Sequence, residues 1–445
     1  MTAAFEQRPG AEGLVIRRWP APAPDPTHLL GFGAEEAVVL RSGPGDRALS
    51  RWSYGALEPM AHAPSLSAAR AALAGWAVPA RRDLPPFFSG AVGYMGYDLG
   101  WAYAPRPRVP RPDPLGLPHA RFALFDAVYA RDEHTGEGWL MAQDTPEARR
   151  RLDYLQAALR RPTPARRGGL QAGLHAGVSQ ATHEGRVREL LGLIEAGEVY
   201  QVNLTYPLLG RYAGAPEAAF GRLVAGGAPP FAAYLGLGRG QAVVSASPEC
   251  FLHLDPWAGE LATYPIKGTR RRGATPEADA EEAARLRADP KEAAEHVMIV
   301  DLLRNDLGRL APPGGVRVDG LAYVESFPTV HHLTSRVVAR LPGGLTDEAL
   351  LAALFPGGSI TGAPKLRAME LIDALEGQPR GLYTGAIGYL TPDGGLMTSI
   401  AIRTAQIVQG ELRFGVGGGI VADSDPTREW EETQVKARAL AAALT

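Results

Sequence analysis

The sequence predicts a protein that combines β-strands with α-helices, because segments with strand patterns and segments with helix patterns follow one another along all 445 residues. Short apolar runs rich in valine, such as residues 37–40 and 242–246, are typical of strands. Residues 145–160 instead have helical spacing, with positive charges late in the segment as helix ends prefer. The length is sufficient for two or three domain-sized units or for one large intertwined core.

The amino-acid composition limits the classes of molecule with which the protein can be expected to interact. The 46 Lys and Arg residues nearly balance the 48 Asp and Glu residues, which argues against nucleic acid or a membrane surface as partner, since both favour a strongly basic face. A single cysteine allows no intramolecular disulfide and no multi-cysteine metal site. The first residues lack the apolar core of a signal peptide, and no run of about 18 apolar residues occurs. We expect a soluble, cytoplasmic protein that acts on a small molecule.

The first half of the chain predicts strands joined by irregular loops up to about residue 60, followed by a helix at 67–77. Residues 86–98 form a glycine-interrupted strand pattern, and residues 122–130 and 138–143 predict a hairpin. A stretch rich in Pro, Arg and Gly at 161–169 then indicates a linker. We divide the chain into residues 1–165, a linker at 166–181, and a second region at 182–445.

The second region begins with a predicted helix at 182–196 and a strand at 198–205. The apolar strand predicted at 242–252 is interrupted by Ser247, Pro248 and Glu249, and a carboxylate in such a run is costly unless it has a partner or stays protonated. Two further helices are predicted to begin after N-capping aspartates, Asp289 and Asp425, each followed by proline.

Lys267 lies between a proline and a glycine at the end of an apolar strand pattern. A free lysine amine has a pKa near ~10.4, so only about one in a few thousand is nucleophilic at neutral pH. Burial beside other cations would lower this pKa and would make the lysine a nucleophile. The alternative is an ordinary surface cation at a strand end.

The run Pro265-Ile266-Lys267-Gly268-Thr269 resembles a motif of the chorismate-utilising enzymes. In that family the aminodeoxychorismate synthases have lysine at the middle position and the anthranilate synthases have alanine. At least six ordered motifs between residues 182 and 445 share the resemblance, and the first half shares it more loosely. The resemblance implies an α+β fold of two β-sheets packed as a sandwich with helices outside, with both halves of the chain interleaved in one globule. It also implies Mg²⁺-dependent amination of chorismate through a covalent bond to Lys267.

The resemblance assigns roles to particular residues. Lys267 would be the nucleophile, and Glu249 would be the general acid; the alternative for Glu249 is a simple strand-end glutamate. His331 and His332 are adjacent on a predicted strand and therefore point to opposite faces, and His332 is the one that matches the family's histidine near the reacting ring. A zinc site is disfavoured because no third nitrogen or sulfur ligand is nearby.

Other matches concern the substrate. Gln201 stands where the isochorismate and salicylate synthases have a lysine base, so activation of water is disfavoured; otherwise it would be a polar residue on an exposed strand face. The loop at 356–365 exposes backbone N–H groups before a helix that is predicted to begin at Pro364, which suits a carboxylate, although a glycine loop that merely turns has the same pattern. A buried Arg403 would bind an anion, either a substrate carboxylate or a structural partner. The implied substrate-binding residues are Gln201, Gly268, Thr269, Ser359, Tyr383, Arg403, Gly417, Gly418 and Gly419.

Two pairs of glutamates, each three residues apart, follow the two N-capping aspartates. Like charges at this spacing repel, and a shared cation would turn the repulsion into attraction. The resemblance implies one Mg²⁺ bound directly by Glu295 and Glu432, with Glu292 and Glu429 acting through water. The alternatives are a capping role for Glu292 and a surface ion pair between Glu432 and Lys436.

Three further points concern the reaction, the source of ammonia and inhibition by tryptophan. Anthranilate synthase component I, and a chorismate-binding regulatory module without turnover, are the rival functions. Cys250 lies on an apolar strand and lacks the glycine-flanked setting of a glutaminase nucleophile, so a separate glutamine amidotransferase subunit would supply the ammonia. Relatives bind tryptophan through a Leu-Leu-Glu-Ser motif; here Arg41 replaces the glutamate, and we expect no inhibition by tryptophan.

Overall fold

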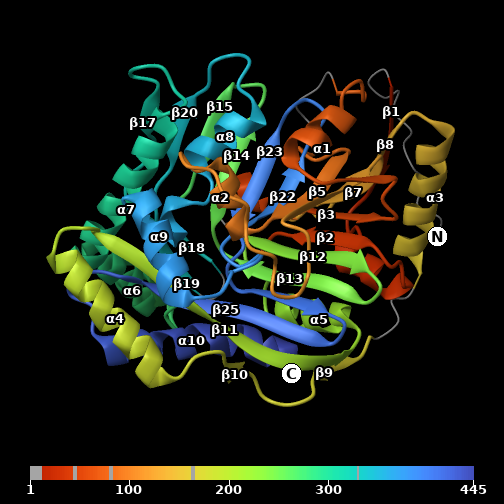
Figure 1. Ribbon diagram of the computed structural model, residues 1–445. Helices are drawn as coiled ribbons and strands as arrows, with labels where there is room; N and C mark the ends of the chain where they lie inside the picture. The colour runs from red at the N-terminus through yellow and green to blue at the C-terminus, as the bar shows by residue number, and fades with distance from the viewer. Residues whose placement is uncertain (1–12, 44–47, 80–83, 162–165, 328–329) are drawn as a thin grey trace.

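Figure 1 shows two large antiparallel sheets with helices around them, in a computed structural model that describes residues 13–43, 48–79, 84–161, 166–327 and 330–445. The larger sheet has 13 strands. Their order is β1 (Leu14–Trp19), β8 (Gly138–Gln143), β7 (Ala127–Asp132), β3 (Trp52–Leu57), β2 (Ala37–Arg41), β12 (Phe231–Gly238), β13 (Gln241–Ser247), β24 (Thr404–Val408), β25 (Glu411–Ile420), β11 (Gln201–Gly214) and β10 (His175–Ala176), with β9 (Gly168–Leu170) and β21 (Gly362–Ala363) also on β11.

The second sheet has nine strands and packs against the first. Its order is β17 (Val316–Val318), β20 (Val337–Arg340), β15 (Glu260–Thr263), β14 (Cys250–Asp255), β23 (Leu396–Ile400), β22 (Ala386–Leu390), β5 (Gly90–Met95), β6 (Ala120–Phe125) and β4 (Ala61–Ala63). Side chains from both sheets share one buried cluster, with Tyr54 and Val243 from the first and Val92 and Ile387 from the second. The predicted α+β architecture of two packed sheets is therefore confirmed.

Within the described residues, the chain passes between the two large sheets four times through a short break of one to three residues. These breaks lie at residues 58–60, at Asp126, at residues 248–249 and at residues 401–403. The predicted strands at 122–130 and 242–252 are thus each two strands in different sheets, because a single polar or proline-containing break redirects the backbone. The hairpin prediction holds for β7 and β8.

A third sheet, which the sequence did not predict, consists of β16 (Ile266–Arg271), β19 (Val330–Thr334) and β18 (Tyr323–Ser326). It continues the two-stranded ribbon of β15 and β20, and the ribbon leaves the nine-stranded sheet where Ser335 N–H donates to the carbonyl of Pro265 at 3.2 Å. Lys267 is the second residue after this departure point. The position of Lys267 is therefore set by the proline that ends the pairing.

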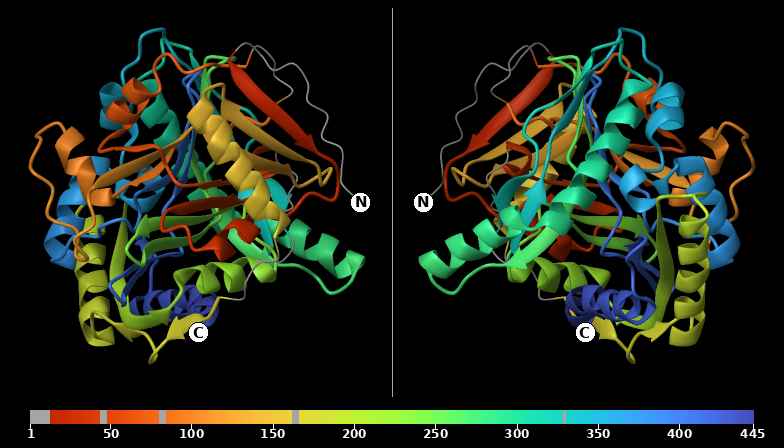
Figure 2. Two further views of the ribbon diagram at one scale, coloured as in Figure 1. Left: turned by 90° about the vertical axis from the view of Figure 1, so that its right-hand side faces the viewer. Right: turned by 90° about the vertical axis from the view of Figure 1, so that its left-hand side faces the viewer.

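Helices cover the outer faces and ends of the sheets. They are α1 (Leu66–Ala72), α2 (Gly100–Tyr103), α3 (Pro146–Arg160), α4 (Gln180–Glu195), α5 (Pro216–Ala225), α6 (Pro276–Ala288), α7 (Pro290–Gly308), α8 (Asp347–Leu354), α9 (Lys365–Glu376) and α10 (Pro426–Leu444), with 3₁₀ turns η1 (Pro26–Phe32), η2 (Ala48–Ser50), η3 (Tyr97–Leu99) and η4 (Gly358–Ile360). Figure 2 shows α6 projecting from the body of the molecule and α10 lying across its base.

The N-cap predictions for α7 and α10 are confirmed. The Asp289 carboxylate accepts from the N–H groups of Lys291 and Glu292, and the Asp425 carboxylate accepts from Thr427 and Arg428. Each cap satisfies N–H groups that have no partner inside the helix. Pro364 is the residue before α9 and not its first residue, which moves that predicted start by one position.

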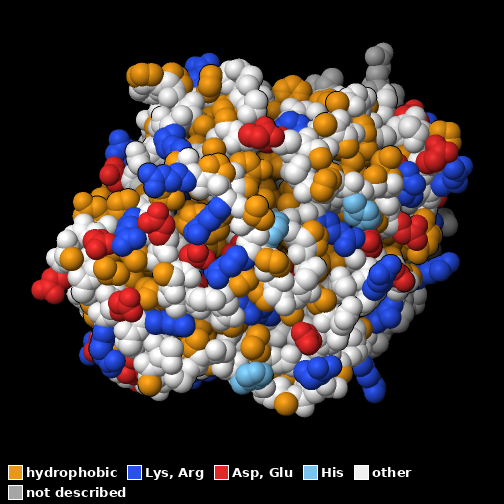
Figure 3. Space-filling view, in the orientation of Figure 1, with side chains coloured by type: hydrophobic (Ala, Val, Ile, Leu, Met, Phe, Trp, Pro, Cys, Tyr) orange, Lys and Arg blue, Asp and Glu red, His pale blue; other side chains and the backbone are white. Residues whose placement is uncertain are grey.

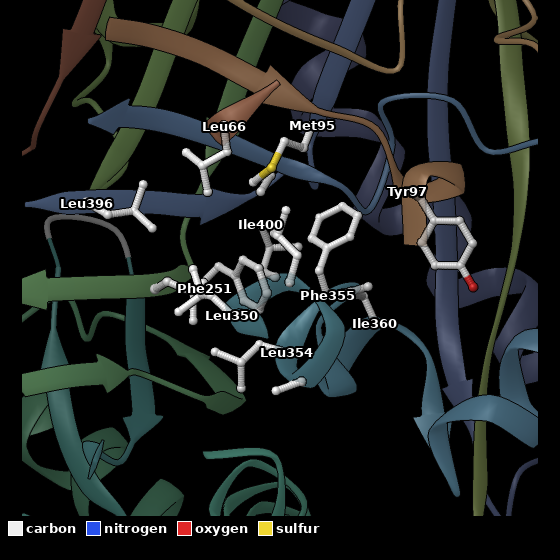
Figure 4. Close-up of a cluster of buried hydrophobic side chains, with 14 of the residues drawn as sticks. Leu66, Met95, Tyr97, Phe251, Leu350, Leu354, Phe355, Ile360, Leu396 and Ile400 are labelled. Carbon is white, nitrogen blue, oxygen red and sulfur yellow. The ribbon is translucent and has the colours of Figure 1, made fainter. Parts of the chain in front are cut away.

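A large apolar cluster stabilises the region between the nine-stranded sheet, α8 and η4. Figure 4 shows Phe251 and Phe355 converging on Ile400, with ring centroids of the two phenylalanines 6.2 Å apart. Complete burial of such side chains is worth about 1.5–3 kcal/mol each. This cluster fixes the end of β14 and the start of the loop at 356–364 relative to each other.

Strands from both halves of the chain pair directly in both sheets. β2 pairs with β12 in the larger sheet, and β5 pairs with β22 in the smaller one. Within the predicted linker, residues 168–170 and 175–176 form short strands on β11, while residues 162–165 lie outside the described part of the chain.

Positive and negative side chains are intermixed over the face drawn in Figure 3. This agrees with the near-zero net charge of the sequence. Among the described helices, none combines the length and apolar character that crossing a bilayer requires.

Candidate active site

Lys267 lies beside a bulge in the ribbon of β16 and β19. The register shifts between Lys267 and Thr269, and the extra residue is Gly268 with φ +68°. A Cβ atom on Gly268 would lie 2.8 Å from Leu286 and 3.0 Å from the Glu292 carboxylate. Glycine is therefore required twice, by the backbone conformation and by the close approach of α7.

The side chain of Lys267 points towards α7. Its amine lies 3.4 Å from the Glu295 carboxylate, and about a quarter of each side chain is exposed. The charged group that the amine contacts is therefore a carboxylate, whereas burial beside cations was the condition considered from sequence for an activated lysine.

The two adjacent histidines have different surroundings, as expected for opposite faces of a strand. The His331 ring contacts the carboxylate of Asp279 and the hydroxyl of Ser326, both at 2.9 Å, and these contacts hold it against α6. The buried ring of His332 instead lies 3.0 Å from the Thr269 hydroxyl, next to Lys267. Only His332 is therefore placed beside the lysine motif.

Glu249 and Arg403 lie on two sheet crossings that run side by side. The Ile400 N–H donates to the Glu249 carbonyl at 3.1 Å, and the Ala246 N–H donates to the Arg403 carbonyl at 2.9 Å. Glu249 is 9% exposed, and its carboxylate accepts from the Ser359 hydroxyl at 2.9 Å. The apolar run around Glu249 can contain a carboxylate because the chain changes sheets at this point and the Ser359 hydroxyl donates a hydrogen bond to it.

Arg403 is exposed and not buried as predicted, because it lies in the break between β23 and β24 with φ +50°. Among the described residues, no carboxylate forms an ion pair with its guanidinium, so a structural partner is not observed there. β24 pairs with β25 only as far as Phe414, which leaves residues 415–420 with one unpaired edge next to Arg403. Backbone N–H groups at this edge and a free cation suit a carboxylate ligand.

Glycines on β25 make room for site residues. The ring of Tyr383 lies over Gly415, where an added Cβ would come within 2.2 Å of ring atoms. An added Cβ on Gly418 would lie 2.9 Å from the Glu429 carboxylate, and one on Gly417 would lie 2.4 Å from the carbonyl of Leu204. The strand is therefore lined with residues that let α10 and neighbouring side chains approach its backbone.

Gln201 is buried at the start of β11, so the alternative of a polar residue on an exposed strand face is excluded. Its side chain is 1% exposed, and neither its amide nitrogen nor its amide oxygen has a hydrogen-bond partner among the described residues. A Cβ on Gly419 would lie 2.8 Å from the amide nitrogen. A buried amide without partners is costly, and a bound polar ligand or water would satisfy it.

The four glutamates of the predicted metal site offer carboxylate oxygens, which Mg²⁺ prefers as ligands, but their side chains do not form a cluster. Glu295 contacts Lys267, Glu432 contacts Lys436 at 2.7 Å as the surface alternative expected, and the described residues contain no group of three His, Cys, Asp or Glu that could hold a metal ion. Burial and then the Glu295 carboxylate raise the pKa of Glu292, and burial and then the Glu432 carboxylate raise the pKa of Glu429. This repulsion is what a bound cation with oxygen ligands would relieve.

An ion pair links the two helices that carry these glutamates. Lys291 of α7 lies 2.9 Å from Asp423, which is three residues before the start of α10. Although burial raises the pKa of the Glu432 carboxyl group, the positive charges of Lys436, Lys267 and Lys291 together lower it. The lysine motif and both glutamate pairs therefore lie in the same region of the molecule.

Sequence reasoning missed a buried ion pair behind this site, Glu376 with Arg380. The only sequence signal is a Glu and an Arg four residues apart around Gly377, a spacing that more often marks a surface pair. A cavity of about 400 Å³ lies elsewhere, between the sheets near Ser42, Trp52 and Tyr389.

A sequence model of the family described as chorismate binding enzyme matches residues 31–442. The chain is 44% identical over 348 residues to aminodeoxychorismate synthase component 1 of Klebsiella aerogenes, which covers 78% of this chain and 75% of that protein. It is 39% identical over 425 residues to anthranilate synthase component 1 of Thermus thermophilus, which covers 94% of this chain and 88% of that protein.

Among solved structures, anthranilate synthase component I from Streptococcus pneumoniae superimposes with a TM-score of 0.77. The two chains are 28% identical, and the match covers 89% of this chain and 93% of the other. The two-sheet fold is therefore shared with an enzyme that also resembles this chain in sequence.

Proposed function

We propose that this chain, which belongs to the chorismate binding enzyme family, aminates chorismate with ammonia to give 4-amino-4-deoxychorismate. The observation that carries the proposal is Lys267, which extends from the bulged ribbon towards the acidic residues of α7. The similarity to the aminodeoxychorismate synthase of Klebsiella supports the same choice.

Lys267 would act as a covalent nucleophile. Its deprotonated amine forms a bond to ring carbon C2 while the bond from C4 to its hydroxyl oxygen breaks, and Glu249 donates the proton with which that hydroxyl leaves as water. Ammonia then forms a bond to C4, loses a proton, and expels the lysine amine from C2. The contact between Ser359 and the Glu249 carboxylate would orient the acid.

The remaining residues would hold the substrate. Arg403, Tyr383 and the backbone N–H groups of Gly417, Gly418 and Gly419 would bind a carboxylate at the open edge of β25. His332 and Thr269, which contact each other, would lie beside the ring. Gln201 would hydrogen-bond the substrate without removing a proton from water, because an amide is not a base.

Glu295 and Glu432 would bind Mg²⁺ directly, with Glu292 and Glu429 acting through water. The ion would supply positive charge that neutralises a substrate carboxylate. Binding would draw Glu295 away from Lys267 and Glu432 away from Lys436, since each carboxylate now contacts a lysine.

The direct test is Lys267→Met, which keeps most of the side-chain volume and removes the amine. With ammonium and Mg²⁺ present, we expect formation of aminodeoxychorismate to fall by at least about a hundredfold. Arg271→Met, at the exposed end of the same strand, is the control and should retain activity. Unchanged product formation by Lys267→Met would exclude the covalent route.

Anthranilate synthesis is the second candidate, favoured by the similarity to the Thermus anthranilate synthase over 94% of this chain. That reaction also eliminates pyruvate, so the mass of the product and an assay for pyruvate separate the two reactions. Failure to consume any chorismate would instead favour a binding module without turnover.

We further propose that a separate glutamine amidotransferase subunit supplies the ammonia. Cys250 is buried, and its thiol contacts the sulfur of Met397, so it is not available as a glutaminase nucleophile. The isolated chain should use ammonium salts but not glutamine, and its rate should rise with pH as the fraction of free ammonia grows. Glutamine hydrolysis by the pure chain, measured as glutamate release, would contradict this.

A further inference from the structure

One arginine, Arg380, connects three separate segments of the chain behind the site. Its side chain is 3% exposed, and its guanidinium donates to the Asn203 carbonyl at 2.6 Å, to the Ile360 carbonyl at 2.9 Å and to the Thr384 hydroxyl at 3.2 Å. The remaining donors form a two-point ion pair with Glu376 at 2.9 and 2.7 Å. Every donor direction of the planar group is therefore used.

Each connected segment carries a proposed substrate-binding residue. Ile360 directly follows Ser359, and Thr384 directly follows Tyr383. Asn203 lies two residues after Gln201 on β11, so both side chains are on the same face of that strand. The guanidinium thus determines where these segments lie relative to one another, although it contacts none of the three binding side chains.

Glu376 extends the network and fixes the strand itself. Its carboxylate oxygen accepts from the Thr205 N–H at 2.8 Å and from the Thr205 hydroxyl at 2.9 Å. Thr205 is the residue paired with Gly417 in the register of β11 and β25. The ion pair therefore also reaches the glycine strand at the edge where the carboxylate would bind.

Thr384, which follows Tyr383, has an unusual backbone conformation that contacts with its neighbours must hold in place. Its φ of +62° is unusual for a threonine, and its hydroxyl donates to the Tyr383 carbonyl at 2.6 Å while accepting from Arg380. A left-handed conformation at a β-branched residue persists only where surrounding contacts enforce it. Arg380 supplies one of those contacts.

We propose that Arg380, held by Glu376, is a positioning residue that aligns Gln201, Ser359 and Tyr383 for chorismate. The inference rests on the proposed function, since it assumes that these three residues contact the substrate. A lysine at position 380 would keep the positive charge but could not reach all acceptors with a single ammonium group. The segments would then shift relative to one another, and substrate binding would weaken even in a folded protein.

The experiment compares Arg380→Lys with Arg151→Lys, a matched variant far from the site. Arg151 forms a similar two-point pair with Asp126 and anchors α3, so its loss affects the fold alone. At a temperature where both variants are folded by circular dichroism, Arg380→Lys should lower kcat/KM for chorismate at least about tenfold, chiefly through KM. Arg151→Lys should change it by less than about twofold. Equal effects of the two variants would overturn the proposal.

A double-mutant cycle with Ser359→Ala separates positioning from general destabilisation. If Arg380 acts by positioning Ser359, the Ser359→Ala substitution should lower kcat/KM for chorismate by a much smaller factor in the Arg380→Lys background than in the wild type. Additive losses would overturn the proposal. Should Arg380→Lys not fold, Glu376→Gln, which keeps the volume and one acceptor oxygen, replaces it in the same cycle and is judged by the same criterion.

The assay follows depletion of chorismate and identifies the product separately by mass. A product other than aminodeoxychorismate would contradict the proposed amination and leave the cycle fully informative about Arg380. If the wild type consumes no chorismate, the cycle is carried out on dissociation constants for chorismate measured by equilibrium dialysis, with the same non-additivity expected.

Discussion

Individual residues of this site have their roles because of local backbone geometry. Gly268 forms a bulge that places Lys267, and the glycines of β25 leave space that other side chains enter. Glu249 and Arg403, which interrupt apolar runs, lie where the chain passes between sheets. A polar group at such a crossing can find hydrogen-bond donors or solvent that a strand interior does not offer.

Gly419 lies against the buried side chain of Gln201. In Gly419→Ala the added methyl group would lie 2.8 Å from the Gln201 amide nitrogen and would displace that buried side chain. We expect KM for chorismate to rise about tenfold or more while the fold is retained, which steady-state kinetics and circular dichroism will show. Gly192→Ala on α4 is the control, since its Cβ meets nothing within 4 Å. Equal KM values for both variants would show that Gln201 does not contact the substrate.

At the scale of elements, α7 and α10 each carry one glutamate pair of the proposed metal site, and each helix start is fixed by a capping aspartate. Asp425→Ala should lower the free energy of unfolding by about 1 kcal/mol, because two N–H groups lose their acceptor. It should also raise the Mg²⁺ concentration that gives half-maximal chorismate turnover, because Glu429 lies in the first turn of α10. Denaturant unfolding and a Mg²⁺ titration measure the two effects.

The control for that prediction is Thr275→Ala, which removes the cap of the projecting helix α6. It should cost a similar free energy of unfolding without changing the Mg²⁺ requirement, because no proposed ligand is on α6. A shift in the Mg²⁺ requirement of equal size in both variants would indicate general loosening and not a metal site at α10.

At the scale of the whole molecule, buried titratable groups link stability to pH. His183 is packed between Tyr206 and Trp430, and burial lowers its pKa to about 4. The unfolded chain binds a proton near pH 6.5 and the folded chain does not, so this contribution to stability is present above pH 6.5 and is lost as pH falls towards 4. The loss amounts to about 3 kcal/mol.

His183→Phe should remove that part of the acid sensitivity. Neither ring nitrogen of His183 has a hydrogen-bond partner among the described residues, so phenylalanine can replace it without leaving a donor unpaired. The free energy of unfolding of the variant should fall less than that of the wild type between pH 6.5 and 4.5, as urea unfolding at several pH values will show. His134→Gln, on an exposed hairpin turn, is the matched control. Parallel curves for His183→Phe and wild type would contradict the assignment.

Local patterns determined much of this protein from sequence alone. The capped starts of α7 and α10 and the hairpin of β7 and β8 follow from capping residues, turn residues and strand patterns, which act within a few positions, whereas the fold class came from the family resemblance. The motif around Lys267 likewise indicated the family, because the motif is contiguous in the chain.

Only the tertiary structure decided which distant segments meet. It split two predicted strands between sheets, placed a carboxylate beside Lys267, exposed Arg403 and buried Gln201. It also turned Glu376 and Arg380, which have the spacing of a surface pair, into the buried connection between three segments. Burial depends on which long-range strand pairings form, and those pairings are set by the packing of the whole chain and not by the residues adjacent in sequence.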